Sequence, residues 1–159
     1  MSPLRVIREA TAADAAVIAR IVNLAYEIER AFIDGDRTSE AEVRRHLEHG
    51  RFLVLEEDRE PVGCVYVEEK GERGYLGMLS VLPDRQGGGR GRMLVEAVER
   101  ACRCAGCRAV DLWIVDLREE LFGFYTRLGY EPTGEKPFTD PRLKRAARFL
   151  VYTKVLTAP

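Results

Sequence analysis

The chain has 159 residues, of which 46% are hydrophobic, a size and composition typical of one domain around one core. Its 25 basic and 26 acidic residues give a net charge of −1, which excludes a bulk field that draws the protein to nucleic acid or to an anionic membrane. No stretch approaches the roughly 20 apolar residues of a membrane span, and no long apolar run follows the N-terminus. We therefore expect a single domain over residues 1–159, a cytoplasmic location, and no nucleic-acid or membrane partner.

The first half of the chain predicts two helices and four strands. Thr11 and Asp14 have the spacing of a capping box that opens the first helix. A second capping box near Ser39 is predicted to open the second helix. The last predicted strand of this half is apolar on both faces, so we expect it to be central in a sheet. The predicted elements are a strand at 5–9, helices at 11–25 and 39–50, and an antiparallel meander of strands at 51–57, 62–69 and 75–82.

A run of glycines after the third strand of the meander is the most informative feature. The strand ends before Pro83, the glycines follow, and a helix opens directly out of them. Because glycine has no Cβ, successive N–H groups can converge on an anion, and the following helix adds the positive end of its dipole. Arg90 and Arg92 add charge at the same place. The segment therefore predicts an anion cradle, with a surface turn that binds nothing as the alternative.

Two common glycine motifs do not fit this segment. A P-loop ends in Gly-Lys-Ser or Gly-Lys-Thr, whereas here the glycines lead into Arg90 and Arg92. A dinucleotide-binding fingerprint places a third glycine at the position that Arg92 occupies. The ligand is therefore not expected to be a nucleotide of either of these two classes.

The second half of the chain predicts alternating helices and strands. A helix with Leu94, Val98 and Ala101 on one stripe ends at Gly106, and a later helix ends at Gly129. The remaining predicted elements are strands at 109–115, 130–136 and 148–156 and a helix at 119–128. Together with the meander, this order predicts an α/β fold with a mixed sheet and helices on its faces.

The cysteines do not indicate a metal site. Cys102, Cys104 and Cys107 cluster, but the only other cysteine is Cys64 on a strand, and no second ligand group lies nearby in the sequence. We expect reduced thiols and no metal.

Tyr125 lies near the end of the helix at 119–128. The apolar residues of that region recur at helical spacing, at Leu117, Leu121, Phe124 and Leu128, and predict its buried stripe. Tyr125 follows Phe124 by about 100° around the helix, which places it at the edge between core and cleft. Its hydroxyl would be accessible there; the alternative is a core tyrosine with a satisfied hydroxyl.

Two motifs resemble those of one family. Gln86-x-x-Gly89-x-Gly91, preceded by Val-x-Pro, resembles the acetyl-CoA-binding signature of the Gcn5-related N-acetyltransferase (GNAT) family, and the segment from Phe124 to Tyr130 is similar to the end of that family's last helix. The order of elements is similar from end to end. The resemblance implies a GNAT-like acyl-CoA N-acyltransferase fold, with a mostly antiparallel meander followed by a βαβ unit and helices on both faces.

The resemblance also implies a reaction. Acetyl-CoA would be the cosubstrate, held between two splayed strands, and an amine would attack its thioester directly through a tetrahedral intermediate, with one backbone N–H of the central strand near the oxyanion. Tyr125 would be catalytic and would share its proton with the leaving thiolate, because full transfer from a phenol to a thiolate is uphill by roughly 2 kcal/mol. The implied contacts to acetyl-CoA are Leu79, Ser80, Val81, Gln86, Gly87, Gly88, Gly89, Arg90, Gly91, Arg92 and Tyr125.

The acceptor side departs from the family pattern. Tyr75 and Trp113 stand where the family often has a glutamate, and Arg118 stands where it often has asparagine. The carboxylates that remain as a base or amine anchor are Glu27, Glu29 and Asp116, with a water relay as the alternative, and Tyr75 is a further candidate for contact with the acceptor. We expect the loops at 32–38 and 137–147 to wall the acceptor pocket.

The acceptor itself stays open at this stage. Arg142 and Lys144, in the second of these loops, could hold a carboxylate or phosphate of the acceptor. The favoured function is N-acetylation of a primary amine of a small molecule or peptide; the alternatives are a protein acetyltransferase acting on lysine or an N-terminus, and a regulatory domain that binds CoA without catalysis. Members of the family often pair through their terminal strands, so a homodimer is a further expectation.

Overall fold

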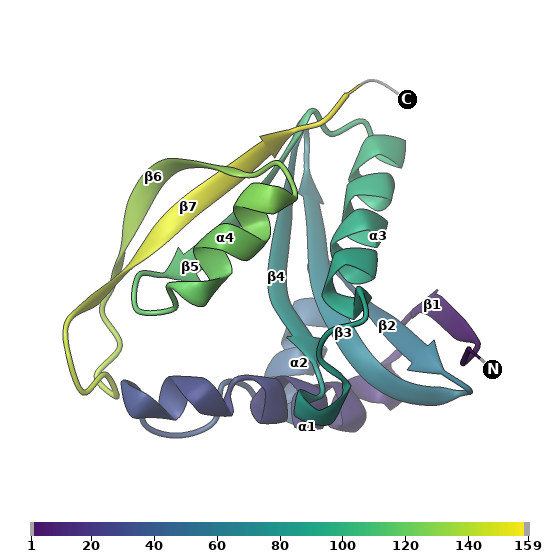
Figure 1. Cartoon of the computed structure of the whole chain (residues 1–159), viewed down its shortest axis with the longest axis horizontal. Coiled ribbons are helices and arrows are strands. Elements are labelled where there is room, and N and C mark those ends of the chain that lie inside the picture. The colour runs from purple at the N-terminus through teal and green to yellow at the C-terminus, as the bar shows by residue number, and fades with distance from the viewer. Residues whose placement is uncertain (1, 158–159) are drawn as a thin grey trace.

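A seven-stranded sheet in the order β1-β2-β3-β4-β5-β7-β6 runs through the molecule (Figure 1). The structure is a computed structural model and describes residues 2–157. Every neighbouring pair of strands is antiparallel except β4 and β5, which are parallel. The strands are β1 (Arg5–Glu9), β2 (Arg51–Glu57), β3 (Glu60–Lys70), β4 (Arg73–Val81), β5 (Ala109–Val115), β6 (Glu131–Phe138) and β7 (Ala147–Val155).

In the part of the chain that the structure describes, four α-helices and three short 3₁₀ helices connect these strands. The α-helices are α1 (Ala15–Ala25), α2 (Glu40–Leu47), α3 (Arg90–Cys104) and α4 (Glu120–Arg127), and the 3₁₀ helices are η1 (Ala12–Asp14), η2 (Glu27–Ala31) and η3 (Pro83–Arg85). No helix within residues 2–157 is long and apolar enough to cross a membrane.

The predicted helices are present, with two differences in their bounds: the capping box at Thr11 opens the 3₁₀ helix η1 ahead of α1, and α2 ends at Leu47, before the predicted end near residue 50. The Thr11 N–H donates to Asp14 at 2.8 Å, and Ser39 Oγ accepts from the Glu42 N–H at 3.2 Å. At the far ends, Gly106 and Gly129 adopt φ values of 87° and 97°, a left-handed conformation that glycine adopts without strain. The starts of η1 and α2 and the ends of α3 and α4 are therefore set by signals that are local in the sequence.

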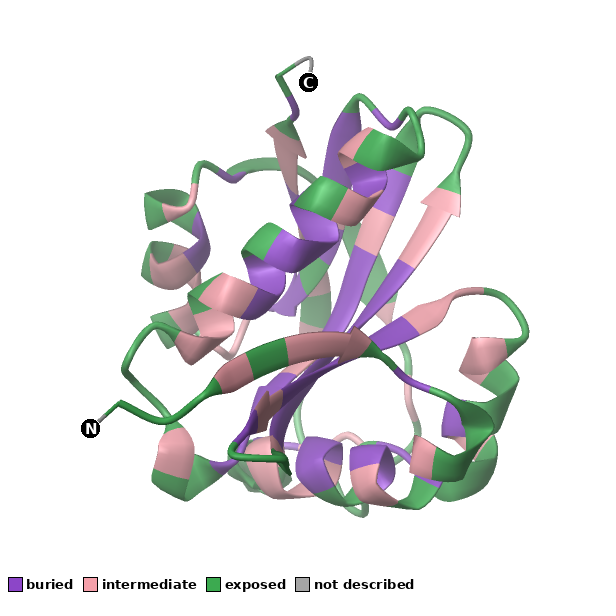
Figure 2. Cartoon of the chain, turned by 90° about the vertical axis from the view of Figure 1, so that its right-hand side faces the viewer, coloured by how far each residue is buried: buried purple, intermediate pink, exposed green. Residues whose placement is uncertain are grey.

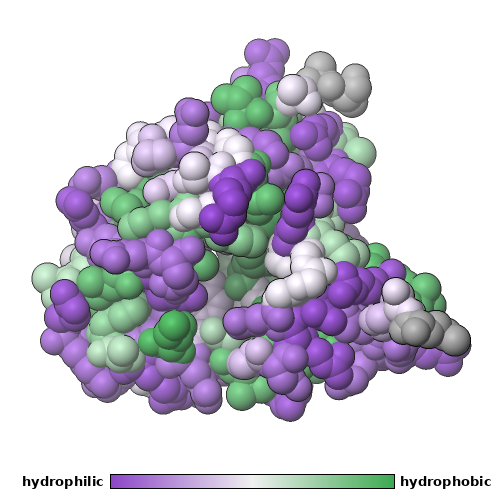
Figure 3. Space-filling view, viewed as in Figure 1, coloured by the Kyte–Doolittle hydropathy of each residue, from purple (hydrophilic) through white to green (hydrophobic). Residues whose placement is uncertain are grey.

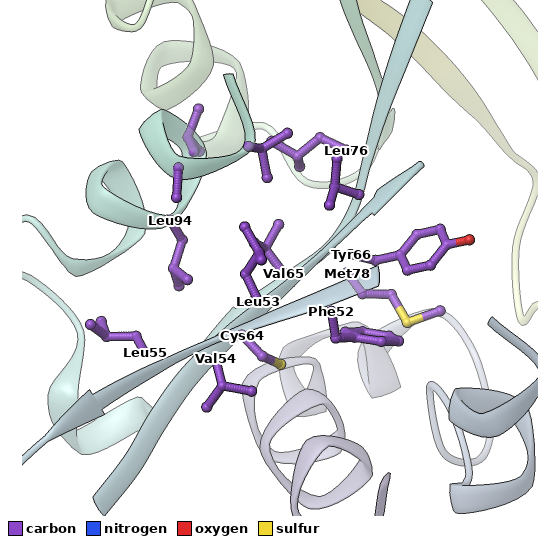
Figure 4. Packing of buried hydrophobic residues seen from close by; sticks show 14 of the residues in the cluster. Phe52, Leu53, Val54, Leu55, Cys64, Val65, Tyr66, Leu76, Met78 and Leu94 are labelled. Carbon is purple, nitrogen blue, oxygen red and sulfur yellow. The ribbon is translucent and has the colours of Figure 1, made fainter. Parts of the chain in front are cut away.

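The meander is confirmed, and its third strand, β4, is the fourth of the seven strands in the sheet. Helices cover both faces, so the central strands are buried on both sides (Figure 2). Figure 4 shows the consequence of strand alternation: Leu53 and Val65 point to the side of Leu94 on α3, whereas Phe52 and Cys64 point to the opposite side of the sheet. These four strand residues are all at most 8% exposed.

The sheet opens between β4 and β5. The two strands pair only from Arg73 with Ala109 to Tyr75 with Asp111, and they diverge beyond that point. Met78 adopts a φ of 50°, and the register with β3 shifts there, so that Met78 and Leu79 lie opposite the single residue Val65. This bulge leaves part of the backbone of β4 outside the regular ladder, facing the opening.

Candidate functional site

Two cavities meet at the opening between β4 and β5. The first, here called the groove, has a volume of about 660 Å³ and lies between the glycine loop (residues 86–91), α4 and the end of α1. The second, the inner cavity, has a volume of about 260 Å³ and lies between β4, β5 and the loops that follow η2 and β6. The space-filling view shows a hollow in the middle of this face, with apolar residues inside it and hydrophilic residues around the rim (Figure 3). Four residues line both cavities: Tyr26, Leu79, Leu121 and Tyr125.

The glycine loop has the backbone of an anion cradle. Gly87, Gly88 and Gly89 are all left-handed, with φ values of 90°, 63° and 77°. Their N–H groups donate to no other group within residues 2–157, while Arg5 and Arg90 hold the carbonyl oxygens of Gly88 and Gly87 at 2.8 and 3.2 Å. A Cβ added to Gly87 or Gly89 would meet nothing within 4 Å, so these positions border open space. The loop thus fits a diphosphate that accepts hydrogen bonds from its free N–H groups.

A buried carboxylate supports this loop from behind. Glu57, at the end of β2, is 3% exposed and accepts from Arg90 at 2.6 Å and from Arg5 at 2.8 Å, with Arg85 at 3.3 Å. The hydrogen bonds from Arg90 hold the pKa of Glu57 below its ordinary value. The sequence contains no local signal for this contact, because Glu57 lies far from the loop along the chain.

Arg90 supports the loop from within, and its predicted contact with acetyl-CoA stays a prediction. Arg90 lines the groove, but its guanidinium group is committed to Glu57 and to the carbonyl of Arg85 at 2.8 Å. Arg92 remains available, because its side chain is 66% exposed and its one ion pair within residues 2–157 is an exposed one with Glu96 at 3.4 Å. Arg92 therefore brings a positive charge to the groove that a ligand can reach.

The other residues predicted to contact acetyl-CoA divide into two sets. Leu79, Val81, Gln86 and Gly91 line the groove together with Gly87 and Gly89. Ser80 and Gly88 do not, since the buried Ser80 hydroxyl donates to the Met78 carbonyl at 2.9 Å and the carbonyl of Gly88 faces Arg5. For these two residues only the backbone can take part.

Tyr125 lies where the groove and the inner cavity join, but it is not at the edge of a buried stripe. It is 5% exposed, whereas Leu121 and Phe124 are only half-buried. The reason is that α4 covers the opening of the sheet, so its inward face borders the cavities instead of a filled core. The Tyr125 hydroxyl makes no hydrogen bond to any residue of 2–157, and burial raises its pKa well above the usual value. Tyr125 is therefore a neutral donor.

Tyr26, which sequence reasoning missed, also lies at this junction. The guanidinium carbons of Arg37 and Arg118 lie 5.3 and 5.8 Å from the centre of its ring. Burial raises the pKa of Tyr26 to about 12, so it too stays protonated. No local signal could have found it, because it continues the apolar stripe of α1 and looks like a core residue.

Of the three candidate carboxylates, only Glu29 lines the inner cavity. It is 7% exposed, and its Oε2 accepts from Arg118 at 2.8 Å. Burial raises the pKa of Glu29, and the charge of Arg118 opposes that rise. Glu27 is exposed and lines the groove instead, whereas Asp116 accepts from the Arg148 N–H at 3.2 Å and lines neither cavity.

Aromatic residues occupy the positions where the resemblance would place a glutamate. Tyr75 and Trp113 line the inner cavity with their ring centroids 5.4 Å apart, and Trp113 is 43% exposed. Burial raises the pKa of Tyr75. This wall of the cavity supplies apolar surface and no carboxylate.

The two loops predicted to wall the acceptor pocket do line the inner cavity, and they contact each other. Ile33 and Leu143 form an isolated β-bridge, and the Lys144 N–H donates to the Phe32 carbonyl at 2.8 Å. Figure 1 shows the loop after β6 descending to meet the segment that follows α1.

The two cations predicted to hold an acceptor anion are engaged within the loops. Arg142 binds Asp140 at 2.9 Å, and Lys144 lies 3.5 Å from Asp34 and donates to the Arg30 carbonyl at 2.9 Å. Each of these two cations therefore already has a carboxylate partner in the loops.

The four cysteines are unpaired thiols; Cys64, Cys102 and Cys107 are buried and Cys104 is exposed. No group of three or more His, Cys, Asp or Glu residues in the described part of the chain is arranged to hold a metal ion.

Solved structures share this fold. A ribosomal-protein-alanine N-acetyltransferase from Brucella melitensis is 22% identical with a TM-score of 0.78, over 95% of this chain and 99% of that one. The protein yncA from Salmonella typhimurium, solved with its cofactor acetyl-CoA, is 22% identical with a TM-score of 0.74, over 96% and 94%. A paia N-acetyltransferase from Thermoplasma acidophilum in complex with coenzyme A is 16% identical with a TM-score of 0.75, over 96% and 99%.

The sequence pattern of one family matches the chain directly. The match is to the Acetyltransferase (GNAT) family and covers residues 20–130, which include the second half of α1, the glycine loop and α4. This is more than half of the chain, and it contains both motifs that carried the resemblance. The protein therefore belongs to the GNAT family and is an acetyl-CoA-dependent N-acetyltransferase.

Proposed function

We propose that this enzyme acetylates the primary amine of a small molecule, with acetyl-CoA in the groove and the amine in the inner cavity. The observation that carries the proposal is the position of the Tyr125 hydroxyl, which lies where the two cavities join and has no partner within residues 2–157. A donor held in such a place meets both substrates of an acyl transfer.

The groove supports binding of the acyl carrier in two ways. The free N–H groups of the glycine loop and the charge of Arg92 would hold the diphosphate. Leu121 and Phe124 supply apolar surface along the groove toward Tyr125. Bound there, acetyl-CoA would supply the activated acetyl group.

The chain's own residues would assist the transfer at two atoms. As the amine nitrogen bonds to the acetyl carbon and the carbon–sulfur bond breaks, the Leu79 N–H in the bulge of β4 would stabilise the oxyanion of the tetrahedral intermediate. Tyr125 would donate a hydrogen bond to the departing sulfur. Because burial raises the pKa of this tyrosine, donation of a hydrogen bond is favoured over full proton transfer.

Glu29 is the residue best placed to accept a proton from the amine. It lines the inner cavity, and its Oε1 has no hydrogen-bond donor within the described residues. Its raised pKa makes it a better base than an ordinary carboxylate, while the charge and the hydrogen bond of Arg118 oppose that rise.

The size of the inner cavity favours a small acceptor. Its volume of about 260 Å³ is below the range typical of sites for drug-sized ligands, and two contacting loops form one wall. An enzyme that acts on a protein substrate needs an entrance wide enough for a chain segment beside the amine, which such a wall restricts.

The test has two steps. At a hundredfold excess over its dissociation constant, acetyl-CoA should stabilise the fold by about 2.7 kcal/mol, seen as a raised thermal midpoint. A panel of small amines should then release thiol from acetyl-CoA in an amine-dependent way. Stabilisation without thiol release for any amine would favour a binding domain, and no stabilisation would contradict the proposal.

A further inference from the structure

Among the residues that the structure describes, one arginine that lines the inner cavity is not paired with a carboxylate. Arg37, in the loop that follows η2, lines the cavity and forms no ion pair within residues 2–157. The other cations around the cavity are paired with carboxylates: Arg118 with Glu29 at 2.8 Å, Arg30 with Asp36 at 2.6 Å, and Arg142 with Asp140 at 2.9 Å.

The ring of Tyr26 holds this guanidinium group in position. The Arg37 Cζ lies 5.3 Å from the ring centroid, and stacking of this kind leaves the N–H donors at the edge of the guanidinium plane free. The same charge lowers the pKa of Tyr26, of Tyr75 and of Glu29, three residues that line the inner cavity, against the rise that burial causes. Arg37 therefore acts on the interior of the cavity although its side chain is exposed to solvent.

We propose that the acceptor is a free amino acid, whose carboxylate binds Arg37 while its amine lies between Glu29 and Tyr125. The proposal rests on the proposed function and narrows it. A planar guanidinium group with free donors matches a carboxylate in a bidentate arrangement, and the remaining walls of the cavity are aromatic and apolar. A peptide or protein N-terminus lacks this carboxylate, because it is converted into an amide.

Paired substrates test the inference. Amino acids and the matching amino-acid amides are compared by kcat/KM from thiol release, with wild type, Arg37→Gln, Arg37→Lys and the control Arg145→Gln. Arg145 is an exposed arginine that lines neither cavity, so the control removes the same charge elsewhere. Comparing the amino-acid-to-amide ratio between proteins cancels the intrinsic difference in amine reactivity. Fluorescence of Trp113, the only tryptophan, provides amino-acid binding constants in the presence of CoA.

The expected result is a wild-type preference for amino acids that falls roughly 10- to 100-fold in Arg37→Gln, through KM, and less in Arg37→Lys. Arg145→Gln should keep the wild-type ratio. An effect of the Arg37 charge on Glu29 would change kcat/KM for amino acids and amides alike, and therefore cancels in that ratio. A wild-type preference for amides, or a ratio that Arg37→Gln leaves unchanged, overturns the inference but not the proposed function. If no amine is turned over, the proposed function fails, and the fluorescence titration then tests the anion site by itself. Amino-acid binding that is at least 10-fold weaker in Arg37→Gln supports the site. Absent binding, or binding that Arg37→Gln does not alter, overturns it.

Discussion

The Tyr125 hydroxyl should contribute to turnover and not to binding of the carrier. In Tyr125→Phe, kcat should fall roughly 100-fold while the dissociation constant of CoA stays within about twofold, because only the departing sulfur needs the donor. Tyr130→Phe is a matched control, since that buried hydroxyl donates to Glu99 at 3.0 Å, outside both cavities. Equal kcat values for the two variants would contradict the assignment.

Glu29 should determine the acid side of the pH profile. Its pKa is raised by burial, so activity should decline, as the pH is lowered, at a higher pH than an ordinary glutamate would produce. Glu29→Gln should lower kcat/KM roughly 10-fold and remove this decline. Glu27→Gln, which removes an exposed carboxylate on the groove, is the comparison; an acid limb that persists in Glu29→Gln would assign the base to another group or to water.

The glycine loop works as an element because contacts from β1 and β2 hold it. Arg5 and Arg90 bind its carbonyl oxygens, and Glu57 holds both arginines. Because the arginines bind the carbonyl oxygens of the loop, its N–H groups stay available for the ligand.

Loss of the Glu57 carboxylate should therefore weaken CoA binding from a distance. In Glu57→Gln we expect the dissociation constant of CoA to rise roughly 10-fold, measured by calorimetry, with little change in kcat at saturation, because Arg5, Arg85 and Arg90 all lose a charged partner. Glu60→Gln removes an exposed carboxylate that lies 3.4 Å from Arg85 and should leave binding unchanged. A loop that binds CoA equally well in both variants would show that Glu57 does not position it.

The whole molecule should lose stability in acid. Bonds from arginine hold the pKa values of Asp14, Glu57 and Asp111 below their ordinary values of 3.8 to 4.5. As the pH falls through that range the unfolded chain binds protons first, so this stabilisation is present above pH of about 4.5 and is lost below it. The thermal midpoint should fall between about pH 6 and pH 3, and less steeply in Asp14→Asn. A flat midpoint over that interval would refute this prediction.

Structural features that depend on residues close together in the chain could be predicted from the sequence alone. The strands at Arg51–Glu57 and Ala109–Val115 have the predicted bounds, and Gly106 and Gly129 end their helices where predicted. The glycine run has the backbone conformation that its composition predicts. In all these cases the deciding energies are dihedral preferences, caps and apolar periodicity, which act over a few residues.

Only the tertiary structure decided how the site is charged. The sequence showed arginines and carboxylates but could not show that Arg90 is neutralised by Glu57, that Glu29 meets Arg118 across 89 positions, or that Arg37 has no carboxylate partner in the described part of the chain. These pairings depend on the order of strands in the sheet and on the divergence of β4 from β5, which bring distant segments together. Local backbone preferences thus determine the helices, the strands and the anion cradle. Packing between distant segments determines which charged side chains form ion pairs and which ones line the cavities.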